Sequence, residues 1–232
     1  MKFTKTLIKG KLIKRYKRFF ADIKLNKEVV TAHCPNTGSM MGLLDKDNEV
    51  YISKNDDPKR KLKYTLEIIK VKKNFVGVNT HFANKIAFHG LSNDLIKEIS
   101  NNDNIKPEVF FDKETRFDFL VEKNKQKIFV EVKNVTLFRS KNIAEFPDAV
   151  TSRGSKHLRT LIDATKKGYK TYLLFLVQIE GVESFKIAKD IDKEYYDNYL
   201  LAKKRGVKFL AYRCKINPNE IKIEKKIKII NE

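Results

Sequence analysis

The chain has 232 residues, of which 41% are hydrophobic, so it can bury the core of one large domain or two ordinary ones. Its 49 Lys and Arg against 29 Asp and Glu give a formal net charge of +20, which favours a polyanionic partner such as nucleic acid. Two distant cysteines, Cys34 and Cys214, and the lack of any long apolar run argue against a disulfide scaffold and a transmembrane protein.

We therefore expect a cytoplasmic protein with no membrane partner. An alternative explanation of the charge is an AT-rich genome, which supplies Lys, Asn and Ile codons freely. The sequence alone does not separate the two.

Residues 1–80 are predicted to form one domain, a small β-barrel. Its expected strands are short, rich in β-branched and aromatic residues and separated by polar turns: Leu7–Tyr16, Phe19–Leu25, Val29–Cys34, Glu49–Ser53, Leu62–Lys72 and Phe75–Val78. Such a series suits an OB-fold, and an SH3-like barrel would give much the same pattern.

Residues 81–232 are predicted to form a second domain of alternating helices and strands, α/β by itself and α+β together with the barrel. The expected elements are two short helices ending at Gly90 and Ile99, a polar connection Ser100–Lys106, strands Thr115–Glu122 and Lys127–Val135, a helix from Ser152 or Ser155 to Lys167, a buried strand Thr171–Gln178, a helix Lys193–Arg205 and a last strand Val207–Tyr212.

The strands Thr115–Glu122 and Lys127–Val135 carry the pattern most suggestive of chemistry. A tight turn centred on Asn124 and Lys125 would place Asp118 opposite Glu131. Strand alternation would then put Arg116, Asp118, Leu120, Glu131 and Lys133 on one face. The other face would be a core layer: Phe117, Phe119, Val121, Ile128, Val130 and Val132.

Two opposed carboxylates repel each other, and a hydrated Mg²⁺ can bridge them. Asp118 and Glu131 are therefore predicted metal ligands, and Lys133 is placed to orient a water or to stabilise charge on a phosphate. The alternative is a plain ion cluster in which Lys133 and Arg116 neutralise the two acids.

Basic residues gather at three further places. Arg15, Tyr16, Lys17 and Arg18 interleave cations with a ring, as single-strand binding surfaces do. Lys59, Arg60 and Lys61 form a second cluster. Arg153, Lys156 and His157 lie at the predicted N-terminus of a helix, where anions are favoured. Either these residues contact phosphates, or they are ordinary solvated side chains.

Long sequence blocks around these residues resemble a known family. They are Gly10–Phe19, Ala32–Met40, Asn55–Tyr64, Gly77–Thr80, Val130–Leu137 and Phe146–Thr151, and they are similar to the SfsA family of sugar fermentation stimulation proteins. The spacing Asp-x12-Glu-x-Lys also resembles the PD-(D/E)xK nuclease superfamily.

The resemblance implies an OB-like N-terminal domain, a nuclease-like C-terminal domain, non-specific DNA binding and a link to the expression of sugar-utilisation genes. One departure concerns the first helix of the nuclease core, where the superfamily often carries a Glu. The matching position here is His89 or its neighbour Phe88, and His is a poor Mg²⁺ ligand.

Together these observations predict a DNA-binding protein whose Asp118, Glu131 and Lys133 hydrolyse phosphodiesters with Mg²⁺ or Mn²⁺. The alternative is a catalytically silent nuclease fold that binds DNA as a regulatory factor in sugar (maltose) metabolism. Whether the DNA is single- or double-stranded, and whether RNA is also bound, stays open. No helix-turn-helix or zinc finger is visible.

Overall fold

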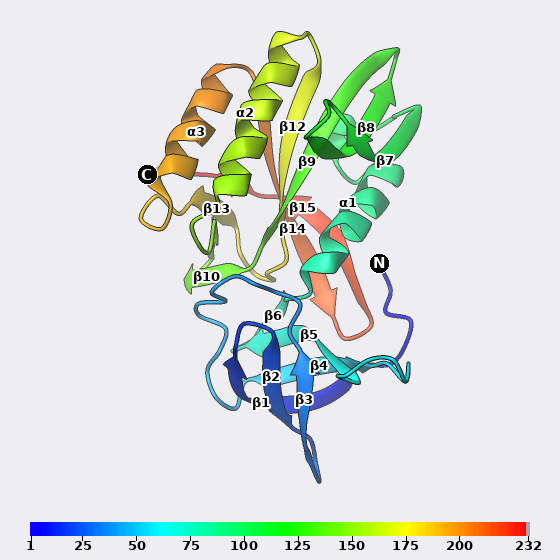
Figure 1. Cartoon of the computed structure of the whole chain (residues 1–232), viewed down its shortest axis with the longest axis vertical. Helices are drawn as coiled ribbons and strands as arrows, with labels where there is room; N and C mark the ends of the chain where they lie inside the picture. Colours follow the sequence, from blue (N-terminus) through cyan, green and yellow to red (C-terminus); the bar gives the residue numbers. More distant parts are fainter. Residues whose placement is uncertain (231–232) are drawn as a thin grey trace.

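The computed structural model describes residues 1–230. Its N-terminal part is a closed β-barrel, which lies beside a larger α+β domain (Figure 1). Its strands are β1 (Ile8–Tyr16), β2 (Phe20–Lys24), β3 (Val29–His33), β4 (Glu49–Lys54) and β5 (Tyr64–Val71). They pair in the order β3-β2-β1-β4-β5, and a parallel pairing of β3 with β5 closes the ring.

This five-stranded closed barrel is the predicted OB-fold. Every strand expected in it is present, together with β6 (Asn74–Gly77), which extends β5. The largest offset is at β5, which begins at Tyr64 rather than at Leu62.

The main sheet of the C-terminal domain has the strand order β15-β14-β12-β9-β8-β7. Its strands are β7 (Asn104–Phe110), β8 (Arg116–Lys123), β9 (Gln126–Val135), β12 (Lys170–Val177), β14 (Lys208–Asn217) and β15 (Glu220–Lys226). The central strands β9, β12 and β14 are parallel, whereas β8 and β15 join them antiparallel. As predicted, β12 is almost entirely buried, because helices cover both faces of the sheet.

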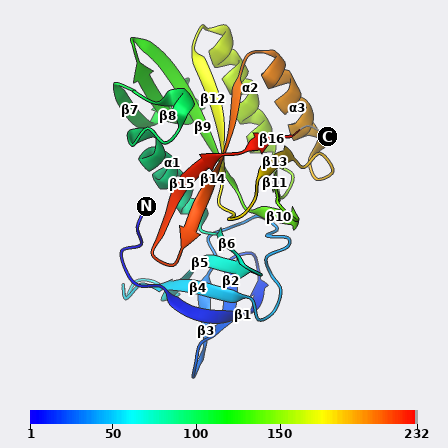
Figure 2. The same ribbon diagram turned by 180° about the vertical axis from the view of Figure 1, so that it is seen from behind.

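Helices α2 (Ser152–Lys166) and α3 (Lys193–Lys204) pack on one face of this sheet. Helix α1 (Ala83–Ser92), preceded by the 3-10 turn η1 (Thr80–Phe82), packs on the other face, as the two opposite views show (Figures 1 and 2). A smaller sheet lies beside α3: β10 (Leu137–Ser140), β11 (Ile143–Phe146), β13 (Ser184–Ile187) and β16 (Lys228–Ile229).

Three expectations for this domain were wrong. The helix predicted up to Ile99 is only a 3-10 turn, η2 (Lys97–Ile99). The polar connection predicted at Ser100–Lys106 overlaps β7, an edge strand whose mostly exposed residues hide its period of two. The strand after α3 is not the last, since β15 and β16 follow it.

No helix among residues 1–230 is long and apolar enough to cross a membrane.

The two-sided burial of the sheet predicts a large cost for truncating β12. Leu174 is 0% exposed and pairs in register with Val132 and Leu210, whereas Leu200 on α3 is 43% exposed. Leu174→Ala should lower the free energy of unfolding by about 2–5 kcal/mol. Leu200→Ala should change it by less than about 0.5 kcal/mol. Denaturant titrations measure both, and equal losses would mean that the sheet is not the core described.

Candidate functional site

One cavity of about 660 Å³ collects six of the predicted site residues. It opens between β7, β8 and β9 on one side and the N-terminal turns of α2 on the other. Its lining includes the hairpin residues Asp118, Glu131 and Lys133 and the helix residues Arg153, Lys156 and His157. We refer to it as the hairpin pocket.

The predicted hairpin register is confirmed as far as the pair next to Asp118 and Glu131. Pairs from Lys123↔Gln126 to Phe119↔Val130 follow the predicted register. The turn residues Asn124 and Lys125 have φ of 48° and 63°, as a two-residue hairpin turn requires.

The predicted alternation of faces fails at the end of this ladder. Phe117 packs against Phe111 and Phe129 on the α2 side of the sheet, whereas Phe119 lies on the α1 side. The backbone pairing of β8 with β9 stops at Phe119. Beyond this point the side chain of Asp118 makes a contact between the two strands. Its Oδ2 accepts a hydrogen bond from the Val132 backbone N–H at 2.7 Å.

Asn84 of α1 holds the other oxygen of Asp118, through a hydrogen bond of 2.8 Å from Nδ2 to Oδ1. Sequence reasoning missed this residue and pointed to His89 or Phe88 instead. Phe88 packs near Phe119, and His89 is exposed and outside the lining of the hairpin pocket. An amide carries no charge, so a search for an acidic residue on this helix does not find it.

Glu131 is 2% exposed and is the most enclosed charged group of the pocket. Its Oε1 accepts a hydrogen bond from Lys133 Nζ at 2.7 Å and also contacts Nδ1 of His157. His157 lies in turn 3.3 Å from Lys133 Nζ and 3.4 Å from Arg153 Nε. The second oxygen of Glu131, Oε2, is buried without a hydrogen-bond partner among residues 1–230.

The pKa values of Asp118 and Glu131 are shifted in opposite directions. Burial, and then the charge of Glu131, raise the pKa of Asp118 above its ordinary value. Burial also acts to raise the pKa of Glu131, but the charges and hydrogen bonds of Lys133 and His157 outweigh it and lower that pKa. Ionised Asp118 is therefore under strain, whereas ionised Glu131 is stabilised by its neighbours.

The plain ion cluster considered from the sequence forms only in part. Lys133 does pair with Glu131, but Arg116 pairs with Glu108 at 2.7 Å. Asp118 consequently has hydrogen-bond donors but no ion pair among the described residues.

A divalent cation fits this donor set if it needs few protein ligands. Within residues 1–230, no group of three or more His, Cys, Asp or Glu side chains is placed to hold a metal. A closed zinc site is thereby ruled out for that part of the chain. Mg²⁺ binds through one or two carboxylates and keeps several waters, which matches Asp118 and the unpartnered Glu131 Oε2.

The predicted basic cluster at residues 15–18 divides into two kinds of residue. Lys17 and Arg18 are exposed in the β1–β2 turn. Arg15 instead donates to the backbone carbonyls of Asn36, at 2.7 Å, and Ser39, at 3.5 Å. Arg15 therefore tethers the Ala32–Met40 segment and is less free for a ligand than was predicted.

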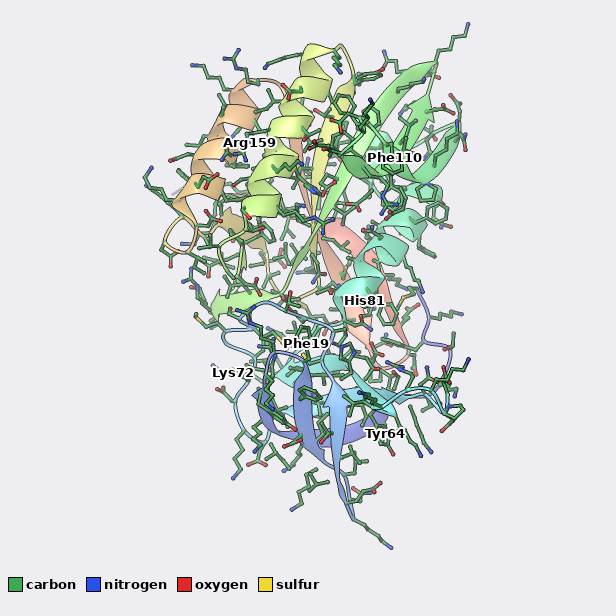
Figure 3. All side chains as sticks on the ribbon, viewed as in Figure 1. Phe19, Tyr64, Lys72, His81, Phe110 and Arg159 are labelled. Carbon is green, nitrogen blue, oxygen red and sulfur yellow. The ribbon has the colours of Figure 1, made fainter. Side chains whose placement is uncertain are left out.

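The aromatic member of that cluster, Tyr16, is also engaged within the barrel. Its ring stacks on Phe20 with centroids 5.5 Å apart, and its hydroxyl donates to Asp22. Among the more exposed rings, Phe19 lies on the barrel, whereas Phe110 lies on the C-terminal domain (Figure 3). Phe110 lines the hairpin pocket.

Lys59, Arg60 and Lys61 lie in the loop between β4 and β5. The β1–β2 and β4–β5 loops are those with which OB-folds contact oligonucleotides. None of the barrel's basic residues lines the hairpin pocket, so the structure separates the predicted residues into a barrel group and a pocket group.

Comparison with known proteins identifies the family. The model of the SfsA N-terminal OB domain matches residues 13–78, and that of the sugar fermentation stimulation protein RE domain matches residues 81–220. The chain belongs to the SfsA family. The resemblance in its sequence blocks is thereby confirmed.

Relatives support this assignment over the full chain. A sugar fermentation stimulation protein homolog of Pelagibacter ubique (strain HTCC1062) is 84% identical, and the match covers 100% of both chains. A homolog from Pseudoalteromonas atlantica is 43% identical over 99% of this chain and 100% of its own. The structure of Pyrococcus furiosus SfsA in complex with Ca²⁺ superposes with a TM-score of 0.88 at 22% identity, covering 100% of this chain and 98% of that one. The SfsA fold, with its N-terminal OB domain and its RE domain, is therefore that of this chain.

The opposite pKa shifts predict opposite effects of neutralising the two acids in metal-free buffer. Above its raised folded-state pKa, ionised Asp118 destabilises the fold, so Asp118→Asn should raise the melting temperature at neutral pH, and this gain should vanish at low pH. Glu131 stabilises the fold above its unfolded-state pKa, and this contribution is lost as pH falls through the lowered folded-state pKa. Glu131→Gln should therefore lower the melting temperature at neutral pH by several degrees, because it leaves Lys133 unpaired. Calorimetric scans at several pH values measure both, and equal shifts of one sign would contradict the assignment.

Proposed function

We propose that this SfsA-family protein is a nucleic-acid-binding protein that hydrolyses phosphodiesters with a divalent cation. The observation that carries the proposal is the half-buried Asp118 beside the buried Glu131, whose Oε2 has no partner among residues 1–230. The same pocket is lined by four cations, Arg116, Lys133, Arg153 and Lys156, and by two further acids, Glu108 and Glu114, which pair with Arg116 and Lys156. A buried carboxylate oxygen without a partner is costly unless a cation satisfies it.

Asp118 and Glu131 would hold Mg²⁺ or Mn²⁺, which when bound supplies Lewis acidity and favours ionisation of a coordinated water. The Ca²⁺ complex of the Pyrococcus furiosus relative supports a hard divalent cation in this family. Asp118 lies on β8 and Glu131 on β9, next to the point where the pairing of the two strands ends. Hydrogen bonds from Asn84 and from the Val132 N–H fix the orientation of Asp118.

The neighbouring cations would bind the phosphate. Lys133, 13% exposed and hydrogen-bonded to Glu131, is placed to stabilise negative charge that develops on a phosphate oxygen. Arg153 and Lys156, in the first two turns of α2, are exposed cations at the same rim, and Lys156 pairs with Glu114. His157, between Glu131 and Lys133, can accept or donate a proton there.

An exposed ring completes the pocket. Phe110 is 66% exposed, and the guanidinium of Arg116 lies 5.6 Å from its ring centroid. Such a ring offers a stacking surface for a base beside the phosphate. We therefore assign chemistry to residues 81–232 and strand capture to residues 1–80, through Lys17, Arg18, Lys59 and Lys61. The substrate would be DNA, or RNA of similar form, in the cytoplasm.

A second candidate function is a silent nuclease fold that binds DNA as a regulatory factor in sugar metabolism. It is favoured by the absence of any acid on α1, whose Asn84 contacts Asp118 through an amide, and by the contacts of Lys133 and His157 with Glu131 Oε1. In that case the pocket would bind phosphate without breaking the diester bond.

Cleavage assays on single-stranded, double-stranded and branched DNA and on RNA, with Mg²⁺ or Mn²⁺, distinguish the two functions. Wild type should cleave at least one form. Glu131→Gln and Lys133→Ala should each reduce the rate by orders of magnitude, because they remove a metal ligand and a charge-stabilising group. Glu122→Gln is the matched control, since Glu122 is an acid of the same hairpin paired with Lys106 outside the pocket. If wild type cleaves no substrate with either metal, the hydrolytic function is rejected and the binding function stands.

The barrel loops should dominate the salt dependence of binding. Lys17→Gln with Arg18→Gln removes two exposed cations from the β1–β2 turn. The log–log slope of affinity against salt should then become shallower by about 0.7–0.9 per lost phosphate contact.

The matched control is Lys72→Gln with Lys73→Gln. It removes the same charge from the exposed β5–β6 turn, where Lys72 also has a positive φ of 56°. Fluorescence titrations at several salt concentrations measure the slopes. Equal slopes for both double variants would mean that net charge, and not these loops, drives binding.

A further inference from the structure

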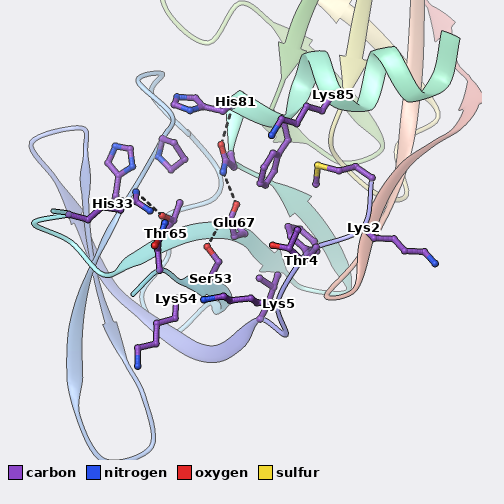
Figure 4. Close-up of a pocket in the computed structure, with 18 residues that line it drawn as sticks. Lys2, Thr4, Lys5, His33, Ser53, Lys54, Thr65, Glu67, His81 and Lys85 are labelled. Carbon is purple, nitrogen blue, oxygen red and sulfur yellow. Dashed lines mark hydrogen bonds between the residues drawn. The ribbon is translucent and has the colours of Figure 1, made fainter. Parts of the chain in front are cut away.

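A second cavity, of about 610 Å³, lies where the barrel meets the N-terminal segment and the start of α1 (Figure 4). We call it the junction pocket. Its lining includes His33 from the end of β3, Arg60 from the β4–β5 loop, Glu67 from β5 and His81 from η1. It shares no lining residue with the hairpin pocket.

Cationic groups converge on this cavity. Arg60 and His81 both act electrostatically on His33, and after burial they are the causes that lower its pKa. The lining also carries four lysines, of which Lys5 and Lys54 pair with Asp56: Lys2, Lys5, Lys54 and Lys85. Glu67 is the single acid of the lining.

Glu67 does not neutralise this charge through an ion pair. Its carboxylate is buried and accepts hydrogen bonds from Ser53 Oγ at 2.6 Å and Asn79 Nδ2 at 2.8 Å, as the dashed lines in Figure 4 show. These neutral donors satisfy both of its oxygens. Among the described residues, Glu67 forms no salt bridge with Arg60, His33 or His81.

The side chains of His33, Arg60 and His81 consequently have few partners within the protein. Within residues 1–230, the imidazoles of His33 and His81 have no hydrogen-bond partner. Arg60 makes one side-chain hydrogen bond, a long one of 3.4 Å to Thr65 Oγ1. Several polar N–H groups and a surplus of positive charge therefore meet in one place, which an anion with several oxygens would satisfy.

The N-terminal segment closes one side of the pocket. The amino group of Met1 donates to the Ile221 carbonyl at 2.7 Å, the Ile221 N–H donates back to Met1, and the Phe3 N–H donates to the Asn219 carbonyl. These bonds fix the segment against the turn between β14 and β15. Because this wall is fixed by backbone hydrogen bonds, the pocket suits a group that ends in it better than a strand that continues through it.

We infer that the junction pocket binds a phosphomonoester, with Arg60, His33 and His81 as its donors. A phosphomonoester carries close to two negative charges and three acceptor oxygens at neutral pH, which matches the Arg60 guanidinium together with the imidazole N–H donors of His33 and His81. The phosphate comes either from a free nucleotide or from the terminal phosphate of a nucleic-acid strand. The site is independent of whether the hairpin pocket hydrolyses diesters.

Nuclear magnetic resonance of the four imidazoles in metal-free buffer tests this site, with inorganic phosphate, AMP and a short oligonucleotide as probes. The oligonucleotide is used with a 5′-phosphate, with a 3′-phosphate and without either. The resonances of His33 and His81 should move on titration, whereas those of His89, exposed on α1, should not. Dependence on a terminal phosphate identifies the strand end as the source, and a response to AMP alone identifies a free nucleotide.

Arg60→Gln should weaken the binding at least tenfold, whereas Lys63→Gln, at an exposed lysine of the same loop outside the lining, should change it less than twofold. The proposal is overturned if no probe shifts the resonances of His33 and His81. It is equally overturned if the oligonucleotide shifts these resonances to the same extent with and without a terminal phosphate, while inorganic phosphate and AMP do not shift them. It is also overturned if Lys63→Gln weakens binding as much as Arg60→Gln, since that result would indicate a non-specific effect of net charge.

Discussion

The buried charge of Glu131 is the constraint on which the hairpin pocket depends. A carboxylate at 2% exposure is tolerated only when cations or donors compensate it, and here Lys133 and His157 both reach one of its oxygens. Lys133 comes from the same strand, but His157 comes from α2, so this contact ties the helix to the sheet. The helix in turn carries Arg153 and Lys156 to the rim of the pocket. One buried acid thereby positions most of the cations that would meet a phosphate.

Asp118 lines the same pocket, but its negative charge is less well compensated than that of Glu131. Counted from the hairpin turn, the pairing of β8 with β9 ends at Phe119, the residue next to Asp118. The Asp118 side chain instead accepts a hydrogen bond from the Val132 N–H. Burial and the charge of Glu131 raise the pKa of Asp118, and the hydrogen bonds from Val132 and Asn84 and the charge of Lys133 offset this only in part. A pair with one compensated and one strained carboxyl favours the uptake of a cation between them. The fold thus keeps this strain at one place, as functional sites commonly do.

Much of this arrangement follows from local sequence. The Asn124–Lys125 turn sets the hairpin register as far as Phe119 and Val130, the residues next to Asp118 and Glu131. The barrel strands follow from their period and their turns. His157 was singled out because it follows a helix start, but its contact with Glu131 depends on the packing of α2 against β9, which no local pattern encodes.

The parts that sequence reasoning missed depend on tertiary contacts. Asn84 is an unremarkable residue of α1 until the helix lies across the end of β8. Arg15 was expected at a nucleic-acid surface, whereas the carbonyls of the Ala32–Met40 segment bind it. Edge strand β7 was missed because exposed edges lack the apolar alternation that marks half-buried strands. The junction pocket joins residues as distant in sequence as Met1 and Lys85, so its cations become a cluster only in the folded chain.

The central claim is that Asp118 and Glu131 take up a divalent cation beside His157. Paramagnetic broadening by Mn²⁺ tests it most directly, since the four histidines report on separate regions of the chain. At substoichiometric Mn²⁺ the resonances of His157 should broaden strongly and before those of His89, and Asp118→Asn should suppress this effect while the fold is retained. If His157 does not broaden, or if all four histidines broaden together and Asp118→Asn changes nothing, the metal site is not where this account places it.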